Sequence, residues 1–192
     1  MNEITITIAG NSITLPAFST ARDALVKAGV ISGEVVPYTG NPVVGVLVNG
    51  ELKPLGAPVP MSCTIEPINA FQGFGRRIYR HSICYLLCYA SRLVFPRRRL
   101  VIGHSLGDGF YFDYEDGRGI TDEQVSHIAE RMNDLVGKKL DISYVSLSNQ
   151  DAIKQLSKQG FEDAVMLLRT TNEPYVNLYK VRDYYQIGRA HV

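Results

Sequence analysis

The period of the hydrophobic residues changes near residue 70, and this change limits the chain to folds with two kinds of module. In the stretch Ile4-Thr5-Ile6-Thr7-Ile8, apolar and polar residues alternate, which is the pattern of a half-buried strand. From Ile78 to Leu93, apolar residues recur at spacings of three and four, which indicates a helix that Pro96 ends. The stretch NAFQGFG over 69–75 separates the two patterns. We therefore predict an α+β fold with a boundary in this stretch.

Turn signals organise the first 69 residues into hairpins around one helix. The pairs Gly10-Asn11 and Asn49-Gly50 each lie between apolar stretches, and such pairs favour tight hairpin turns. Ser19 or Thr20 can cap a short helix between the two hairpins, and a last strand is expected over 63–67. The order of hairpin, helix and further strands predicts a β-grasp-like domain over 1–69, followed by a linker over 70–75.

The second segment, over 76–186, is also expected to be an α+β domain, and an incomplete one. Its helix over 76–95 precedes a short strand over 100–102 and an aromatic strand over 110–114. A capping box from Thr121 to Gln124 opens a helix that ends near Gly137. Beyond it we expect a strand over 142–147, a helix from Ser148 to Gly160, and strands over 165–169 and 176–181. The last residues, IGRAHV over 187–192, break a tyrosine-rich strand pattern, and we assign them to a non-native tail.

Composition excludes several classes of protein. The chain has 20 Lys and Arg against 19 Asp and Glu, a net charge of +1, so no global field attracts nucleic acid, and DNA is not an expected partner. No apolar run approaches the roughly 18 residues of a membrane span, and the N-terminus lacks the basic region of a signal peptide. The three cysteines show no disulfide spacing. Reduced thiols in the cytoplasm are the simplest interpretation.

The helical stretch RHSICYLLCYA over 80–90 raises the question of a reactive face. His81, Cys84 and Cys88 share one side of the helix. A structural zinc site needs four ligands and a catalytic one usually three plus water, and the chain has no CxxC pair to complete such a set. Free cysteines among large apolar residues commonly pack in a core. We therefore predict no metal site and favour packing, with a pocket-lining role as the alternative.

The stretch IGHSLGDG over 102–109 lies between two expected strands. Its glycines and Asp108 are turn formers, so a hairpin connection is favoured over a loop that holds a ligand against backbone N–H groups. His104 and Ser105 are adjacent, and adjacent strand side chains point to opposite faces, so they do not form a nucleophile and base. The aromatic strand that follows could stack nucleic-acid bases, but packing on the helix is favoured.

Several motifs together resemble known families. The first domain resembles a TGS domain, the β-grasp unit shared by threonyl-tRNA synthetases, certain GTPases and stringent-response enzymes. The second resembles the domain that follows TGS in threonyl-tRNA synthetases. The motifs that carry the likeness are YRHS over 79–82, LL over 86–87, FP over 95–96, LVIG over 100–103, DGFYFD over 108–113 and LYKVRD over 178–183. The likeness implies an α+β editing-like fold for 76–186.

The resemblance also assigns roles to positions of the helix. Synthetases of this kind hydrolyse mischarged tRNA with an HxxxH pair and a later Cys/His segment. His81 matches the first histidine, but Tyr85 stands at the second position, and the later segment would follow Asp183. Phenol titrates near pH ~10, so Tyr85 cannot replace imidazole as a base near neutral pH. The chain as it stands is therefore expected to be inactive, with no catalytic residue.

The resemblance leaves three hypotheses. The chain is the front end of a nucleoside kinase, the N-terminal TGS and editing region of a threonyl-tRNA synthetase, or a free-standing module that binds RNA or another partner. Bacterial uridine-kinase-like nucleoside kinases carry both domains ahead of a P-loop kinase domain, and the His-Ser-x-Gly stretch over 104–107 with YLL over 85–87 fits that form better. We therefore expect a regulatory front end whose kinase domain, beyond residue 186, would use ATP and magnesium. The chain itself would bind RNA, tRNA or a small-molecule regulator. Its candidate pocket-lining residues are His81, Tyr85, His104, Ser105, Asp108 and Asp183.

Overall fold

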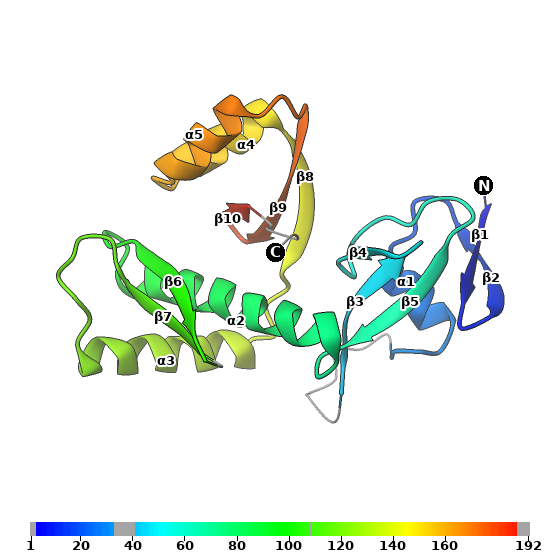
Figure 1. The fold of residues 1–192 in the computed structure, drawn as a ribbon, viewed down its shortest axis with the longest axis horizontal. Coiled ribbons are helices and arrows are strands. Elements are labelled where there is room, and N and C mark those ends of the chain that lie inside the picture. The colour runs from blue at the N-terminus through cyan, green and yellow to red at the C-terminus, as the bar shows by residue number, and fades with distance from the viewer. Residues whose placement is uncertain (1–2, 33–40, 108, 188–192) are drawn as a thin grey trace. The chain divides into compact units, whose positions relative to one another are not determined.

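The computed structural model describes residues 3–32, 41–107 and 109–187 (Figure 1). The chain divides into two compact units, one made of Met1–Tyr79 with Ile142–Val192 and one of Arg80–Asp141. The long helix α2 (Gly73–Val94) passes from the first unit into the second. In the described part of the chain, no helix is long and apolar enough to cross a membrane. The α+β class predicted from the sequence is confirmed.

A mixed five-stranded sheet forms the first part of the larger unit. Its strands are β1 (Glu3–Ile8), β2 (Asn11–Pro16), β3 (Val43–Val48), β4 (Glu51–Lys53) and β5 (Thr64–Asn69), in the order β2-β1-β5-β3-β4. β1 pairs parallel with β5, and the other pairs are antiparallel. Both predicted hairpins are present, although the first turn lies at Ala9-Gly10, one residue earlier than expected, because Ile8 pairs with Asn11.

The core of this sheet follows from strand alternation and one capped helix. Ile4, Ile6 and Ile8 all point to the buried side of β1, as their spacing predicts. Helix α1 (Ala21–Lys27) begins after Thr20, whose side chain forms a capping box with Asp23, and buries Ala21, Ala24 and Leu25 against the sheet. The structure thus selects Thr20 rather than Ser19 as the cap.

The same unit contains a three-stranded antiparallel sheet with two helices. The strands are β8 (Ser143–Ser148), β9 (Tyr175–Val181) and β10 (Tyr184–Ile187), in the order β10-β9-β8, and the helices are α4 (Asn149–Lys158) and α5 (Glu162–Thr170). Figure 1 shows the helices together on one side of these strands. Ile187, assigned above to the non-native tail, is the last residue of β10 and pairs with Leu178 of β9.

The strand expected over 165–169 is wrong, because this stretch is part of helix α5. Val165 and Leu168 are buried while Met166 and Leu167 between them are 69% and 52% exposed, which is the period of a helix and not of a strand. Two acidic residues in the first turn of α5 favour the helix further. A short apolar run does not distinguish a strand from a buried helix, and this run was assigned by composition alone.

The smaller unit packs a β-hairpin and one further helix with the second part of α2. The hairpin consists of β6 (Leu100–Leu106) and β7 (Gly109–Tyr114), and α3 (Asp122–Gly137) follows it. Thr121 and Gln124 form the predicted capping box of α3. Ile128 and Leu135 of α3 are buried, as are Leu100 and Tyr114 of the hairpin. In the aromatic strand β7, Tyr114 packs inward as predicted, whereas Tyr111 is 49% exposed and does not fit that prediction.

Candidate functional site on helix α2 and the adjoining hairpin

Helix α2 changes from exposed to buried along its length. His81 is exposed, whereas Tyr85, Cys88 and Tyr89 are 7%, 9% and 3% exposed. The part of RHSICYLLCYA that follows residue 84 therefore packs, and its first residues face solvent. The interpretation of this stretch as a buried helix side is confirmed for Tyr85 and Cys88 and does not hold for His81.

The two thiols of α2 are poor nucleophiles and poor metal ligands. Burial raises the pKa of Cys88 to about 12, with a further contribution from the neighbouring Cys84, whose own pKa burial also raises. Both therefore remain neutral near pH 7, although metal binding and nucleophilic attack require the thiolate. Among the described residues, no three His, Cys, Asp or Glu side chains cluster as metal ligands would.

His81 and Tyr85 stand one helical turn apart. This spacing is the one at which two imidazoles would share a water or a substrate on a helix face. The buried Tyr85 side chain instead offers a phenol, which does not accept a proton near neutral pH. The pair thus has one imidazole, exposed on the surface, and no second imidazole four residues later. The arrangement supports contact with a ligand better than proton transfer.

The hairpin carries two of the other predicted residues, and they lie within one strand. His104 and Ser105 are exposed in β6, at a register shift between Ile102 and Ser105. The imidazole of His104 stacks on the ring of Tyr111 in β7, with ring centres 6.0 Å apart and planes 21° from parallel. The hairpin interpretation of this stretch is confirmed. Asp108 lies outside the described residues.

Asp183 belongs to a different part of the structure. It is exposed in the turn between β9 and β10, within the larger unit, whereas His81, Tyr85, His104 and Ser105 belong to the smaller one. The smaller unit thus contains four of the predicted residues. Their common role as pocket-lining residues stays a prediction.

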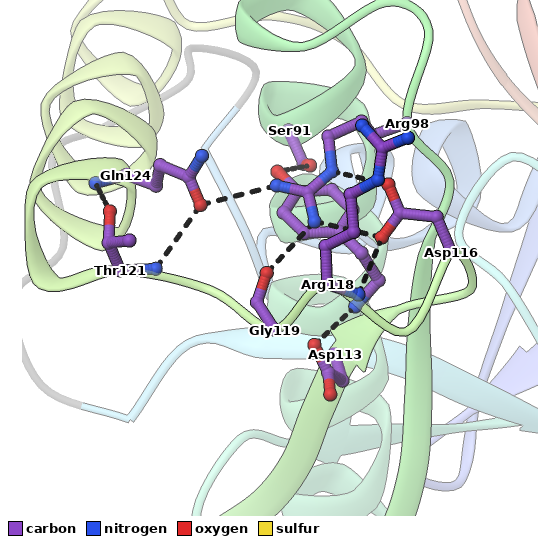
Figure 2. Close-up of polar contacts among 9 residues, drawn as sticks. Ser91, Arg98, Asp113, Asp116, Arg118, Gly119, Thr121 and Gln124 are labelled. Carbon is purple, nitrogen blue, oxygen red and sulfur yellow. Dashed lines mark hydrogen bonds and ion pairs between the residues drawn. The ribbon is translucent and has the colours of Figure 1, made fainter.

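An arginine that sequence reasoning passed over fixes the loop between the hairpin and α3. Figure 2 shows Arg98 donating to Asp116, Gly119 and Gln124, and we call this set the guanidinium clamp. Both oxygens of the Asp116 carboxylate accept, from Nε at 2.8 Å and from Nη2 at 2.9 Å. These hydrogen bonds hold the pKa of Asp116 down at about 2. The Gly119 carbonyl accepts at 2.8 Å and Gln124 Oε1 at 3.2 Å. Because Gln124 also caps α3, the clamp positions that helix.

Beneath the clamp, Tyr114 joins β7 to α2. The Arg98 guanidinium lies 3.7 Å from the centre of the Tyr114 ring, and Phe95 meets the same ring edge-on at 6.0 Å. The Tyr114 hydroxyl lies 2.9 Å from the Ser91 hydroxyl, which has no solvent exposure. These contacts join helix α2 to the β6–β7 hairpin within the smaller unit. The spacing of RRR over 97–99 gives no sign that the middle arginine makes these contacts.

No protein-family model matches the chain. A threonine–tRNA ligase of Acidithiobacillus ferrooxidans is 31% identical over 149 residues, which is 77% of this chain and 23% of that protein. A threonine–tRNA ligase of Thermobifida fusca is 28% identical over 83% of the chain and 23% of its own length, and one of Citrifermentans bemidjiense is 28% identical over 99% and 29%.

The chain is homologous to threonine–tRNA ligases. It spans about a quarter of the length of the relatives it matches. The assignment to the front end of a nucleoside kinase is wrong, because these relatives are ligases and match 77% to 99% of the chain. That assignment weighed His104-Ser105 and the apolar stretch after Tyr85, which are a hairpin strand and a packed helix side. The expectation of ATP and magnesium was tied to the kinase domain and remains a prediction.

Proposed function

We propose that this chain is the N-terminal region of a threonine–tRNA-ligase-type protein and that it binds tRNA. Similarity to the ligases over 77% to 99% of the chain supports the proposal. We include in this proposal the domain limits 1–69 and 76–186 and the pocket-lining role of the candidate residues. A cytoplasmic location belongs to it as well, since the three free thiols suit a reducing compartment.

The finer assignment of 1–69 to the TGS domain rests on strand order. β1 and β5 lie side by side and parallel within the sheet. On the outer side, β1 pairs with its hairpin partner β2, and β5 pairs antiparallel with β3, which forms a hairpin with β4. Helix α1 follows the first hairpin and covers the sheet. A β-grasp domain has this mixed sheet with one helix across it. The order β2-β1-β5-β3-β4 therefore supports the TGS proposal.

The burial of Tyr85 is the observation that favours tRNA binding over hydrolysis of mischarged tRNA. In the synthetases that the chain resembles, two histidines one turn apart perform the editing reaction. Here the second position is a phenol with 7% exposure, and the nearby thiols are neutral. No base is present at that position to activate a water molecule. Binding of the tRNA without hydrolysis is the function that this geometry supports.

Two assays on the same preparation test the proposal. Fluorescence anisotropy with a transcript of the threonine tRNA should show saturable binding at low salt, and absence of binding there would refute the proposal. The second assay mixes the chain with threonine tRNA that carries a wrong amino acid. The ester should disappear no faster than in buffer. Turnover that His81→Ala abolishes would instead establish hydrolytic editing and contradict binding without hydrolysis.

A further inference from the structure

Strand β2 lies at an edge of the five-stranded sheet. In the part of the chain that the structure describes, β1 is its one neighbour in the strand order. The backbone N–H of Thr7 in β1 donates to the carbonyl of Cys63, so the odd-numbered residues of β1 face β5 and the even-numbered ones bond to β2. The register of the β1–β2 pair then places the backbone groups of Ser12 and Thr14 at the free edge. This edge has the geometry to accept one more strand.

A lysine covers one of these edge groups. The ammonium of Lys27, the last residue of α1, donates to the Thr14 carbonyl. Lysines at sheet edges commonly oppose unwanted strand pairing. An ammonium has three donors, so the N–H of an arriving strand can take over this carbonyl while Lys27 turns to a carboxylate. The edge is therefore protected, but it can still accept a strand that brings negative charge.

A groove of about 460 Å³ lies between β2 and α1. Leu15 and Pro16 line it from the strand, and Val26 lines it from the helix. Leu15 is buried and Val26 is half-buried, whereas Pro16 is exposed. The groove thus offers apolar surface directly beside the free backbone groups of β2, as a site for strand addition requires.

The charged side chains of the groove are mainly positive. Arg22 and Lys27 both line it, and five helical positions separate them by about 7.5 Å along the axis. The one carboxylate in the lining, that of Asp23, accepts from the backbone N–H of Thr20 at 2.8 Å and from its hydroxyl at 2.7 Å, which holds it at the start of α1. Alternate side chains of an extended peptide are about 7 Å apart, so the two cations match an acidic strand in charge and in spacing.

An aromatic residue beside the groove has an unfavourable backbone conformation. Phe18 lies between the lining residues Pro16 and Ser19, with φ at +69° and its side chain 91% exposed. This left-handed conformation costs free energy for a residue with a bulky side chain, and glycine would adopt it freely. Large aromatic side chains are common anchors of protein interfaces. The ring is thus placed where a segment bound in the groove would cover it.

We propose that the groove between β2 and α1 binds an extended segment of another protein, in which apolar and acidic residues are mixed. The segment pairs with the free edge of β2 at Ser12 and Thr14. Its apolar side chains enter the groove, its carboxylates pair with Arg22 and Lys27, and the ring of Phe18 packs on it. All of these residues lie in one continuous stretch of the first domain, and the inference does not depend on tRNA binding.

The first test uses a short synthetic peptide that repeats Val-Val-Glu-Glu. Each face of this peptide alternates apolar and acidic side chains when it is extended. Amide signals of the isotope-labelled full chain are followed by nuclear magnetic resonance as the peptide is added. We expect saturable shifts in β2 and α1 and none in β4, the opposite edge of the same sheet. Shifts confined to β4, or no saturable shifts, would overturn the proposal.

Two control peptides separate charge from strand pairing. A Val-Val-Lys-Lys repeat keeps the apolar pattern and reverses the charge. A Val-Val-Glu-Glu repeat with methyl groups on alternate backbone nitrogens keeps the charge but lacks the N–H donors of a strand. We expect both to bind at least about tenfold more weakly than the probe. Equal binding of either control would refute the corresponding part of the site, the cations or the free edge, and with it the proposal.

Substitutions in the chain separate binding from folding. Phe18→Gly removes the ring and relieves the backbone, so it should weaken binding of the probe about tenfold without lowering the urea unfolding midpoint. Arg22→Glu should weaken it at least as much. The matched controls are Met166→Ala, at an apolar side chain with 69% exposure, and Lys154→Glu, at an exposed position of α4. Both controls should bind as the unaltered chain does, and a groove variant that does the same would refute the proposal.

Sedimentation equilibrium distinguishes a separate protein from a second copy of this chain as the occupant of the groove. We expect the unaltered chain to remain monomeric at the concentrations of the titration. If it self-associates and Arg22→Glu disperses it, the groove joins copies of the chain, and the proposal of a separate partner is overturned.

Discussion

Substitution of Tyr114 by phenylalanine tests whether the smaller unit is braced as the structure indicates. The change deletes one hydroxyl and keeps the ring, so the contacts with Phe95 and with the Arg98 guanidinium persist. What disappears is the 2.9 Å hydrogen bond to Ser91, whose side chain is fully buried in α2. The effect therefore reports the hydrogen bond between helix and hairpin and little else.

The expected magnitude follows from the burial of both partners. A neutral buried hydrogen bond contributes a net of about 1 kcal/mol, and an unsatisfied buried polar group costs about 1 to 3 kcal/mol. After Tyr114→Phe, the Ser91 hydroxyl can turn to the backbone carbonyl one helical turn back, so we expect a loss of about 1.5 kcal/mol. After Ser91→Ala, the Tyr114 hydroxyl has no backbone carbonyl of its own helix to turn to, and the free energy of unfolding should fall by about 2 kcal/mol. The double variant, which strands no polar group, should lose about 1.5 kcal/mol.

Urea unfolding of the four proteins forms a double-mutant cycle for this pair. The single losses exceed the loss in the double variant by about 2 kcal/mol, which is the coupling energy expected for groups in contact. Hydrogen exchange at the amides of α2 and β7 reports the unit that contains the bond. Tyr111→Phe is the matched control, because that ring is 49% exposed and its loss of a hydroxyl should leave the unfolding curve unchanged. Additive single losses would refute the reasoning, since they would mean that the two hydroxyls do not interact.

Three further predictions concern acid stability, thiol reactivity and the start of α2. The pKa of Asp116 is about 2 against an ordinary 3.8. The guanidinium clamp should therefore stabilise the fold fully above pH 4 and lose its effect as the pH falls toward 2. If the unfolding midpoint of Asp116→Asn falls with acid as steeply as that of the unaltered chain, the prediction is contradicted. At pH 8.5, iodoacetamide should modify Cys88, whose pKa is about 12, far more slowly than the less buried Cys84, and mass spectrometry of the peptides gives both rates. In Gly75→Ala the added carbon would overlap the carbonyl of Asn69; a loss of about 3 kcal/mol is expected, and unchanged urea stability would show that the turn yields freely.

Features that depend on neighbouring residues in the sequence were predictable. The capping box at Thr121, the hairpin at Asn49-Gly50 and the helix cap at Ser19 or Thr20 each involve residues no more than three positions apart, although the choice of Thr20 comes from the structure. Their physics is local, so the sequence pattern contains the whole interaction. The strand expected over 165–169 failed because a five-residue apolar run is compatible with both periods, and the exposure of Met166 and Leu167 depends on packing that the run does not encode.

The contacts of Arg98 and Tyr114 next to the candidate site were not predictable, because they join residues far apart in the sequence. Arg98 meets Asp116 and Gln124, which are 18 and 26 residues away, and Ser91 meets Tyr114 across 23 residues. Nothing in the triplet over 97–99 distinguishes the clamping arginine from its exposed neighbour Arg97. Long-range pairs of this kind are set by the topology that brings a hairpin onto a helix. A single sequence shows the elements but not which residues meet.

Helix α2 has an exposed part and a buried part that its sequence alone does not distinguish. The same three- and four-residue spacing continues from Ile78 to Leu93, so the pattern predicts one uniformly packed helix. The structure instead buries the part after residue 84, where Tyr85 and Tyr89 lie, and exposes the part before it, where Arg76 and Arg77 lie. A phenol at position 85 suits this division, because it fills the start of the buried part with a large, largely apolar ring. The position at which a second histidine would be needed for hydrolysis thus belongs to the packed half of the helix.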